Sequence, residues 1–203
     1  MNDLESSPII ESKRKRGRET FRQLKPIFCF VSFLMRVFPE FFCNWLLRAL
    51  RYTRGSIGLG LRYILASRLA ESCGNNVSIH DCVFLRYVEL LNLGNNVSIH
   101  PLCYIDAQGG ISIGNDVSIA HNVSILSFEH DFSDTAKLIK DAPCIPKEII
   151  IEDNVWIGAG VRILGGVRVG TGSIIGAGAV ATKDIPPMSI AVGVPARVVA
   201  SRE

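Results

Sequence analysis

The heptapeptide GNNVSIH occupies residues 74–80 and returns letter for letter at 94–100, and GNDVSIA follows at 114–120. The copies are spaced by twenty residues. Within this period small or apolar residues recur every six positions, with an interval of eight between the first sets. The recurring positions are Cys73, Ile79, Leu85, Leu93, Ile99, Ile105, Ile113, Ile119 and Ile125, and then Ile151, Ile157, Ile163, Val169, Ile175 and Ala181. A twenty-residue period is thus three hexads plus two corner residues.

The six-residue interval decides the fold class. It fits neither the 3.6-residue nor the 3.5-residue repeat of helices, and β-branched residues dominate the positions between the small turn residues. Three short strands per turn build a triangular coil, in which each inward side chain stacks on its counterpart about 4.8 Å away. The sequence therefore predicts a mainly β protein, with a parallel β-helix of about five coils over residues 73–186.

The corners of the coils carry glycine and asparagine. Glycine often fills the second hexad position, as at Gly74, Gly94, Gly114, Gly158, Gly170 and Gly176. We expect these glycines to adopt backbone angles that other residues avoid. Asn75, Asn95 and Asn115 follow three of them, and asparagine tolerates the same conformations.

Charge marks a boundary at the start of the repeats. Residues 1–72 hold thirteen Lys/Arg and six Asp/Glu, a net charge of +7, whereas residues 73–203 hold nine and thirteen, a net charge of −4. Residues 1–25 are polar, with the basic run KRKRGR at 13–18, and are expected to form a disordered tail. Residues 26–72 form an apolar, helical region, including a helix from about Ile57 to Glu71.

Two interpretations of residues 26–50 stay open. The longest uncharged run there has ten residues, too few for a helix that spans a bilayer, and no small-residue cleavage site of a signal peptide follows. Short helices broken at Pro39 could pack on the open end of the repeats or on another subunit. Alternatively, an aromatic-rich amphipathic segment could lie peripherally on a membrane surface.

The six cysteines are scattered singly, without any C-x-x-C pair. This argues against a zinc knuckle and favours a reducing compartment. We therefore expect a cytoplasmic protein, or one peripheral on the inner face of the cytoplasmic membrane. The sequence also lacks a P-loop and a basic face with interleaved aromatic residues, so no nucleic-acid partner is expected.

The hexads IGNDVS, IGAGVR and IGAGAV, followed by ATKDIPPMSIAVGVPARVV, resemble the hexapeptide-repeat acyltransferases. The similarity covers residues 73–203, and the nearest branch is the sugar and polysaccharide O-acetyltransferases related to the galactoside and maltose acetyltransferases. The resemblance implies a left-handed parallel β-helix and a homotrimer with active sites between subunits. It also implies acetyl-CoA as the donor substrate, with no permanently bound cofactor.

The hexads break once, after ILSFEH ends at His130, and residues 131–148 intervene as a candidate active-site loop. A sugar hydroxyl needs a base to attack a thioester, and an imidazole can accept that proton at neutral pH. By resemblance, His130 holds the position of the catalytic histidine. Asp106 and Glu129, with Asp131, are candidates to contact the imidazole or the acceptor, and His100 falls near an acceptor-binding position of the family.

A donor site is expected at the repeated tripeptide GAG, which stands at 158–160 and 176–178. Side chains this small leave the backbone open to a pantetheine arm, and cations bind the phosphates of CoA. The residues that the resemblance assigns to CoA are Trp156, Gly158, Ala159, Gly160, Gly176, Ala177, Thr182, Lys183 and Arg197. Residues 187–203 are expected to close this site as a C-terminal tail.

His80, His100 and His121 suggest a rival site. The γ-class carbonic anhydrases bind zinc with three histidines on this fold, but their pair of histidines five residues apart is missing here. We therefore expect no metal site and interpret these histidines as outward-facing corner residues.

The sequence thus predicts transfer of an acetyl group from acetyl-CoA to a hydroxyl of a sugar or glycan precursor. Surface-polysaccharide synthesis (capsule, exopolysaccharide or O-antigen) is the expected setting, with a sugar, nucleotide sugar or lipid-linked glycan as acceptor. Xenobiotic O-acetylation, as of antibiotics, and amino-sugar N-acetylation are the alternatives. A serine acetyltransferase and a non-catalytic solenoid are less favoured.

Overall fold

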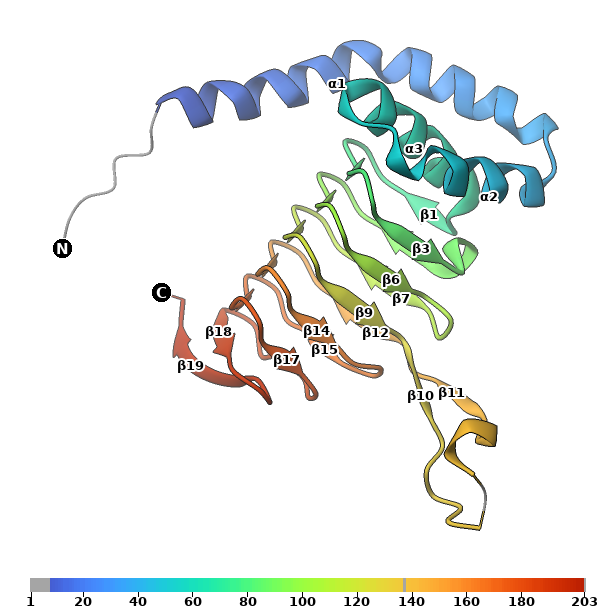
Figure 1. Ribbon diagram of the computed structural model, residues 1–203. Helices are drawn as coiled ribbons and strands as arrows, with labels where there is room; N and C mark the ends of the chain where they lie inside the picture. The colour runs from blue at the N-terminus through green and yellow to red at the C-terminus, as the bar shows by residue number, and fades with distance from the viewer. Residues whose placement is uncertain (1–7, 137, 203) are drawn as a thin grey trace.

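A computed structural model describes residues 8–136 and 138–202. A layer of helices is followed by a β-solenoid with three faces (Figure 1). The helices are α1 (Pro8–Leu34), α2 (Glu40–Ala49) and α3 (Gly55–Leu69), with 3₁₀ turns η1 (Met35–Val37) and η2 (Leu50–Tyr52) between them. None of the helices in the described part of the chain is both long and apolar enough to cross a bilayer.

Each face of the solenoid is a parallel sheet. The first face holds β1 (Ser72–Cys73), β4 (Leu91–Leu93), β7 (Ile111–Ile113), β12 (Ile149–Ile151) and β15 (Arg168–Val169). The second holds β2 (Ser78–Ile79), β5 (Ser98–Ile99), β8 (Ser118–Ile119), β13 (Trp156–Ile157), β16 (Ile174–Ile175) and β18 (Ser189–Val192). The third holds β3 (Phe84–Arg86), β6 (Tyr104–Asp106), β9 (Ser124–Leu126), β14 (Arg162–Ile163) and β17 (Val180–Ala181). Five coils are complete, and β18 begins a sixth.

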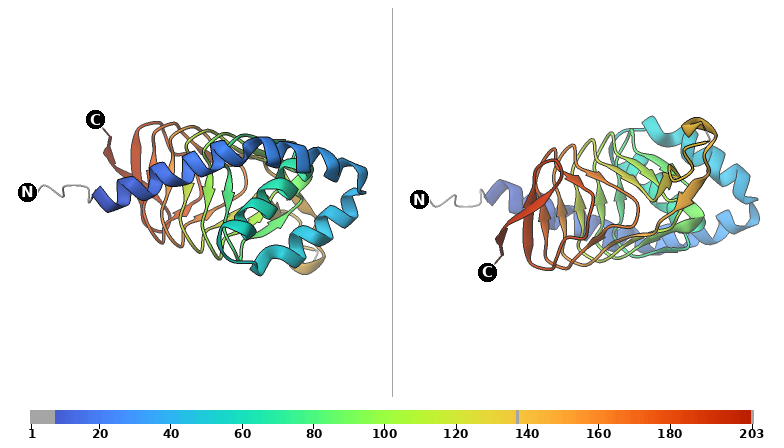
Figure 2. Two further views of the ribbon diagram at one scale, coloured as in Figure 1. Left: turned by 90° about the horizontal axis from the view of Figure 1, so that it is seen from above. Right: turned by 90° about the horizontal axis from the view of Figure 1, so that it is seen from below.

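Three further strands leave the regular coils. β10 (Phe128–His130) and β11 (Cys144–Pro146) form an antiparallel hairpin that stands out from the solenoid. Seen from below, the hairpin projects to the side of the coils (Figure 2). β19 (Arg197–Ser201) folds back antiparallel on β18 and ends the second face.

The core confirms the six-residue pattern. Ile79, Ile99 and Ile119 pair in register on successive coils, and each is at most 1% exposed. Such columns bury nearly every inward side chain of the three faces, which is the main stabilising term of the solenoid. Cys73, in the first coil, is only half-buried.

The corner glycines serve a different purpose from the one expected. Gly74 and Gly94 have ordinary φ values, and the left-handed conformation falls two residues later, on Asn76 and Asn96. A Cβ on Gly94 would lie 2.6 Å from backbone atoms of Gly114 on the next coil. Glycine is therefore required at these corners for close approach between coils.

Asn75, Asn95 and Asn115 likewise do not adopt left-handed angles. They form a ladder instead: the backbone N–H of Asn75 donates to Asn95 Oδ1 at 2.9 Å, and the N–H of Asn95 donates to Asn115 Oδ1 at 2.9 Å. The ladder satisfies polar groups at the corner that the strands leave unpaired.

The expected disordered tail over residues 1–25 is corrected by helix α1, which begins at Pro8 and continues through Pro26. Residues 1–7 lie outside the described residues. Residues 11–25 are rich in Lys, Arg, Glu and Gln, which favour helices, and they extend the apolar segment that packs on α3. The break at Pro39 is present, since Pro39 is the N-cap of α2.

The helical layer is joined to the first coil by a buried arginine. Arg62 of α3 is 2% exposed. Its Nε donates to Ile79 O at 2.7 Å, and its Nη1 donates to Thr53 O at 2.7 Å and Leu50 O at 3.0 Å. One guanidinium thus links α3, the end of η2 and strand β2.

Candidate active site

The candidate residues gather at two different corners of the solenoid. The second corner, between the second and third faces, is formed by residues 80–83, 100–103, 120–123, 158–161 and 176–179. The third corner, between the third and first faces, is formed by residues 87–90, 107–110, 127–148, 164–167 and 182–184. The hairpin of β10 and β11 belongs to the third corner, and both GAG tripeptides belong to the second.

His130 ends strand β10 and is exposed to solvent. Its cross-strand partner is Cys144, whose Sγ lies 3.9 Å from His130 Nδ1. The ring of Phe128 lies edge-on to the imidazole, with 6.4 Å between centroids. The hairpin register, set by the pairing of two strands on either side of the loop, thus places the imidazole on an outer surface.

The carbonyl oxygen of Ala142 lies 3.4 Å from His130 Nδ1. A carbonyl can only accept, so this contact favours the tautomer with the proton on Nδ1. Nε2 then carries the free lone pair of the ring. This is the arrangement that a general base requires, with a backbone group in the orienting role.

Two of the acidic candidates have partners other than His130. Glu129 forms an ion pair with Lys147 Nζ. Asp106 is 1% exposed, its Oδ2 lies 3.3 Å from Arg86 Nη1, and its Oδ1 accepts from Gln108 N–H at 3.3 Å. Asp106 pairs in register with Leu126, four residues before His130. Its contacts therefore hold the third corner beneath the hairpin.

The donor candidates form a stacked column at the second corner. Gly178 N–H donates to Ala159 O at 2.8 Å, and Gly160 N–H donates to His121 O at 3.0 Å. A Cβ on Gly158 would lie 2.6 Å from the backbone nitrogen of Ala177. Gly158 is therefore needed for the close approach of these two coils, and the other members of the column carry side chains no larger than a methyl group.

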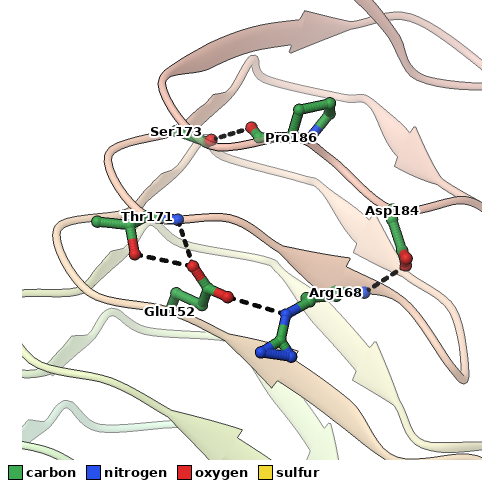
Figure 3. A network of polar contacts seen from close by, with 6 residues as sticks. All are labelled: Glu152, Arg168, Thr171, Ser173, Asp184 and Pro186. Atoms are coloured by element: carbon green, nitrogen blue, oxygen red, sulfur yellow. Dashed lines mark hydrogen bonds and ion pairs between the residues drawn. The ribbon is translucent and has the colours of Figure 1, made fainter.

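The remaining donor candidates are divided between different parts of the solenoid. Trp156 is 53% exposed on the outer side of the second face, and Arg197 begins β19 as an exposed residue. Thr182 and Lys183 are exposed at the third corner, on the same corner as the hairpin. The chain beside Lys183 is held, because Asp184 Oδ1 accepts from the backbone N–H of Arg168 at 2.8 Å (Figure 3).

The same network ties the last two complete coils together. Glu152 Oε1 accepts from Arg168 Nε at 2.8 Å, and Glu152 Oε2 accepts from the N–H and the hydroxyl of Thr171, both at 2.8 Å (Figure 3). These bonds, the one from the Thr171 hydroxyl first, lower the pKa of the Glu152 carboxyl. The network positions the segment from which Lys183 projects.

The structure brings some candidate residues together and keeps others apart. Glu129, Asp106, Thr182 and Lys183 share the third corner with His130, whereas His100 and the GAG tripeptides lie at the second. The third face separates the two corners along the whole solenoid. One chain therefore does not place its own GAG column beside its own His130.

His80 and His100 stack at the second corner, with ring centroids 4.8 Å apart and an angle of 10° between planes. Both rings are half-buried at this corner, whereas His121 is exposed. Among the described residues, no cluster of three or more His, Cys, Asp or Glu side chains could hold a metal ion. Burial, and then the neighbouring His100, lowers the pKa of His80; burial, and then His121, lowers the pKa of His100.

This histidine pair predicts a loss of stability in mild acid. The folded chain favours neutral imidazoles, while the unfolded chain binds protons near the ordinary pKa of about 6.5, so stability rises with pH and falls as the pH drops below that value. Asp81 partly opposes the shift of His80, and Arg62 adds to it. We expect the urea unfolding midpoint of a His80→Asn/His100→Asn protein to fall less than that of the parent when the pH is lowered from 7.5 to 5.5. Equal acid sensitivity of both proteins would contradict this.

Three contacts of the site could not be predicted from the sequence. The Ala142 carbonyl and Cys144 contact His130 because of the register of the hairpin. The loop has no sequence pattern that predicts this register. Arg162 Nη1 donates to Asn122 O at 2.7 Å and Gly160 O at 2.8 Å, bracing the second corner from the third face. The sequence predicts only that the Arg162 side chain is on the outside of the third face, because the next residue, Ile163, is an inward one.

Comparison with known proteins bears on the family. The family described as "Bacterial transferase hexapeptide (six repeats)" matches residues 148–183 of this chain. A maltose O-acetyltransferase structure from Clostridium difficile 630 superposes with a TM-score of 0.71 at 31% identity, covering 81% of this chain and 86% of that one. A galactoside acetyltransferase in complex with coenzyme A gives a TM-score of 0.73 at 30% identity, covering 81% and 80%.

Curated relatives match over shorter stretches. The galactoside O-acetyltransferase of Lactococcus lactis subsp. lactis is 44% identical over 77 residues, which is 38% of this chain and 36% of that protein. The match spans about a quarter of the length of other curated relatives. The likeness to the two solved structures, by contrast, runs through most of both chains. With its hexad columns, its interrupting hairpin and this likeness, the chain belongs to the hexapeptide-repeat acyltransferase family.

Proposed function

We propose that this protein transfers an acetyl group from acetyl-CoA to a hydroxyl of a sugar. The observation that carries the proposal is His130, exposed on its hairpin with Nδ1 facing the Ala142 carbonyl. The chain around it is about 30% identical, over most of its length, to structures of a maltose and a galactoside acetyltransferase. The CoA complex of the latter supports a CoA thioester as donor.

In the proposed mechanism, His130 Nε2 removes the proton of the acceptor hydroxyl while the oxygen attacks the thioester carbonyl. A C–O bond forms, and the carbonyl oxygen becomes an oxyanion that backbone N–H groups stabilise. The tetrahedral intermediate then breaks its C–S bond. The imidazolium returns the proton to the departing CoA thiolate, which gives the acetyl ester, CoA-SH and a neutral histidine.

A homotrimer would complete this site. The His130 hairpin and the GAG column occupy different corners of one chain, so a donor bound along the column needs a histidine from elsewhere. The hairpin of a neighbouring subunit, placed against the second corner, supplies one. Trp156 and the exposed cations Lys183 and Arg197 are then available to border the donor.

The acceptor is proposed to be a glycan precursor of a surface polysaccharide, in the form of a sugar, a nucleotide sugar or a lipid-linked glycan. The names of the two solved relatives support a sugar hydroxyl. The basic, apolar helical layer supports a setting next to lipid-linked intermediates.

The test is CoA thiol release from acetyl-CoA against a panel of maltose, galactosides, nucleotide sugars, amino sugars and an antibiotic alcohol. Release that depends on a hydroxyl-bearing sugar, with a base-labile acetyl ester as product, is the expected result. Release with amino sugars alone, giving a base-stable amide, would replace O-acetylation by N-acetylation. Release with the antibiotic alone would favour the xenobiotic alternative.

A further inference from the structure

The helical layer exposes an apolar face that nothing in the described chain covers. On α1, Phe21, Phe28 and Ser32 face α3: both phenylalanine rings contact Tyr63, with centroids 5.1 and 5.6 Å away, and Ser32 Oγ lies 2.8 Å from Ser67 Oγ. At 100° per residue the opposite side of α1 carries other apolar residues. A helix covered on one side therefore keeps a second apolar side in solvent.

Exposed apolar side chains also follow in η1 and in α2. Its large apolar members are Ile27, Phe30, Phe33, Val37, Phe41 and Trp45, which are between 56% and 84% exposed. Phe41 and Trp45 are four residues apart and so share one side of α2. These six residues are here called the apolar face, and large apolar side chains gathered in solvent in this way mark an interaction surface.

The charge around the apolar face is strongly positive. Residues 20–54 contain six Lys/Arg and one Asp/Glu. Glu40 lies 3.5 Å from Arg68 Nη1, and two of the six cations are turned to the solenoid: Arg54 pairs with Asp81 and Arg51 lies over Phe84. Lys25 on α1 and Arg36 in η1 are both exposed. Aromatic side chains bordered by cations are what an anionic lipid surface binds.

We propose that the apolar face docks this protein in the plane of an anionic lipid bilayer. The helices lie at the end of the solenoid where the first coil is, and the hairpin points away from them (Figure 1), so a bilayer against the helices would leave the hairpin and the GAG column open. No described helix is suited to crossing the bilayer, which fits docking in the interface. Self-association through this face would oppose the same cations in both copies, which disfavours a second copy as the occupant.

The first test measures sedimentation of the full chain with vesicles of phosphatidylcholine alone and with 30% phosphatidylglycerol. We expect strong binding only to the anionic vesicles, weakened at 0.5 M salt. In a Trp156→Phe background, Trp45 is the one remaining tryptophan, and its emission is expected to shift to shorter wavelength on binding. Absence of binding to both vesicles would overturn the proposal, whatever the outcome of the acetyl-transfer assay.

Variants of the face separate docking from folding. Phe33→Asp/Val37→Asp/Phe41→Asp is expected to lower vesicle affinity more than tenfold, and Lys25→Gln/Arg36→Gln to lower it about fivefold per cation. Leu138→Asp and Val199→Asp, at comparably exposed apolar residues outside the helices, are expected to bind as the parent does. If the triple variant instead keeps vesicle affinity and loses its oligomeric state in sedimentation velocity, the face joins copies of the chain and the proposal is wrong.

Discussion

A His130→Ala protein is expected to lose acetyl transfer by a factor of roughly 10²–10⁴, the usual contribution of a positioned general base. The loss should fall on the turnover number. Binding of acetyl-CoA should persist, because the donor column at Gly158–Gly160 lies at the other corner of the chain. The imidazole is exposed and packs into no core, so the variant should fold as the parent does.

The measurement is CoA thiol release under saturating acetyl-CoA, with donor affinity taken separately by calorimetry. Lys140→Ala is the matched control, an exposed residue of the same loop to which no role is assigned. Parent activity in His130→Ala would remove the base from the mechanism and favour a non-catalytic solenoid. A loss of donor binding equal to the loss of turnover would show that His130 holds the donor instead.

The Ala142 contact refines this expectation. If the carbonyl fixes Nδ1 as the protonated nitrogen, a residue that keeps a hydrogen bond but no base should not restore turnover. Asparagine at position 130 can satisfy a carbonyl through its amide, yet it cannot accept a proton at neutral pH. His130→Asn should therefore be as inactive as His130→Ala while it preserves the hairpin.

The solenoid was predictable because its cause is local. Each hexad buries an inward residue such as Ile99, so the pattern survives in the sequence as a strict interval. The place of the β10–β11 hairpin was predictable for the same reason, as the one long gap in that interval. The helix at residues 8–25 was missed because its polar composition is also typical of a solvated tail.

The contacts of the site depend on register and on neighbours distant in sequence. The Ala142 carbonyl contacts His130 across a hairpin, and the loop sequence does not predict how the strands of that hairpin pair. The role of Gly94 depends on the backbone of Gly114, one coil away. From the sequence, only an unusual φ angle could be expected for this glycine. The sequence placed Asp106 one coil before the hairpin, as the structure does. It did not predict that Arg86, on the coil before Asp106, would pair with the Asp106 carboxylate.

Replacing Arg62 by methionine is expected to cost about 3–5 kcal/mol of unfolding free energy. Methionine can fill much of the space of the buried side chain, but it leaves the carbonyls of Thr53 and Ile79 without their shared donor. The Leu50 carbonyl loses one donor and keeps the Thr53 backbone N–H at 3.1 Å. Each buried carbonyl without a partner costs about 1–3 kcal/mol. Arg62→Lys should fall between parent and methionine variant, since an ammonium keeps the charge but not the planar fork.

Urea unfolding at one fixed protein concentration measures this cost, with Arg22→Met as an exposed control expected to stay within about 0.5 kcal/mol. Hydrogen exchange should locate the damage, because Arg62 joins the helical layer to strand β2. Amides of α3 and of the first coil should lose protection, while those of the fourth and fifth coils keep it. A loss below about 1 kcal/mol would mean that water satisfies these carbonyls, and that packing of α3 alone holds the helices on the solenoid.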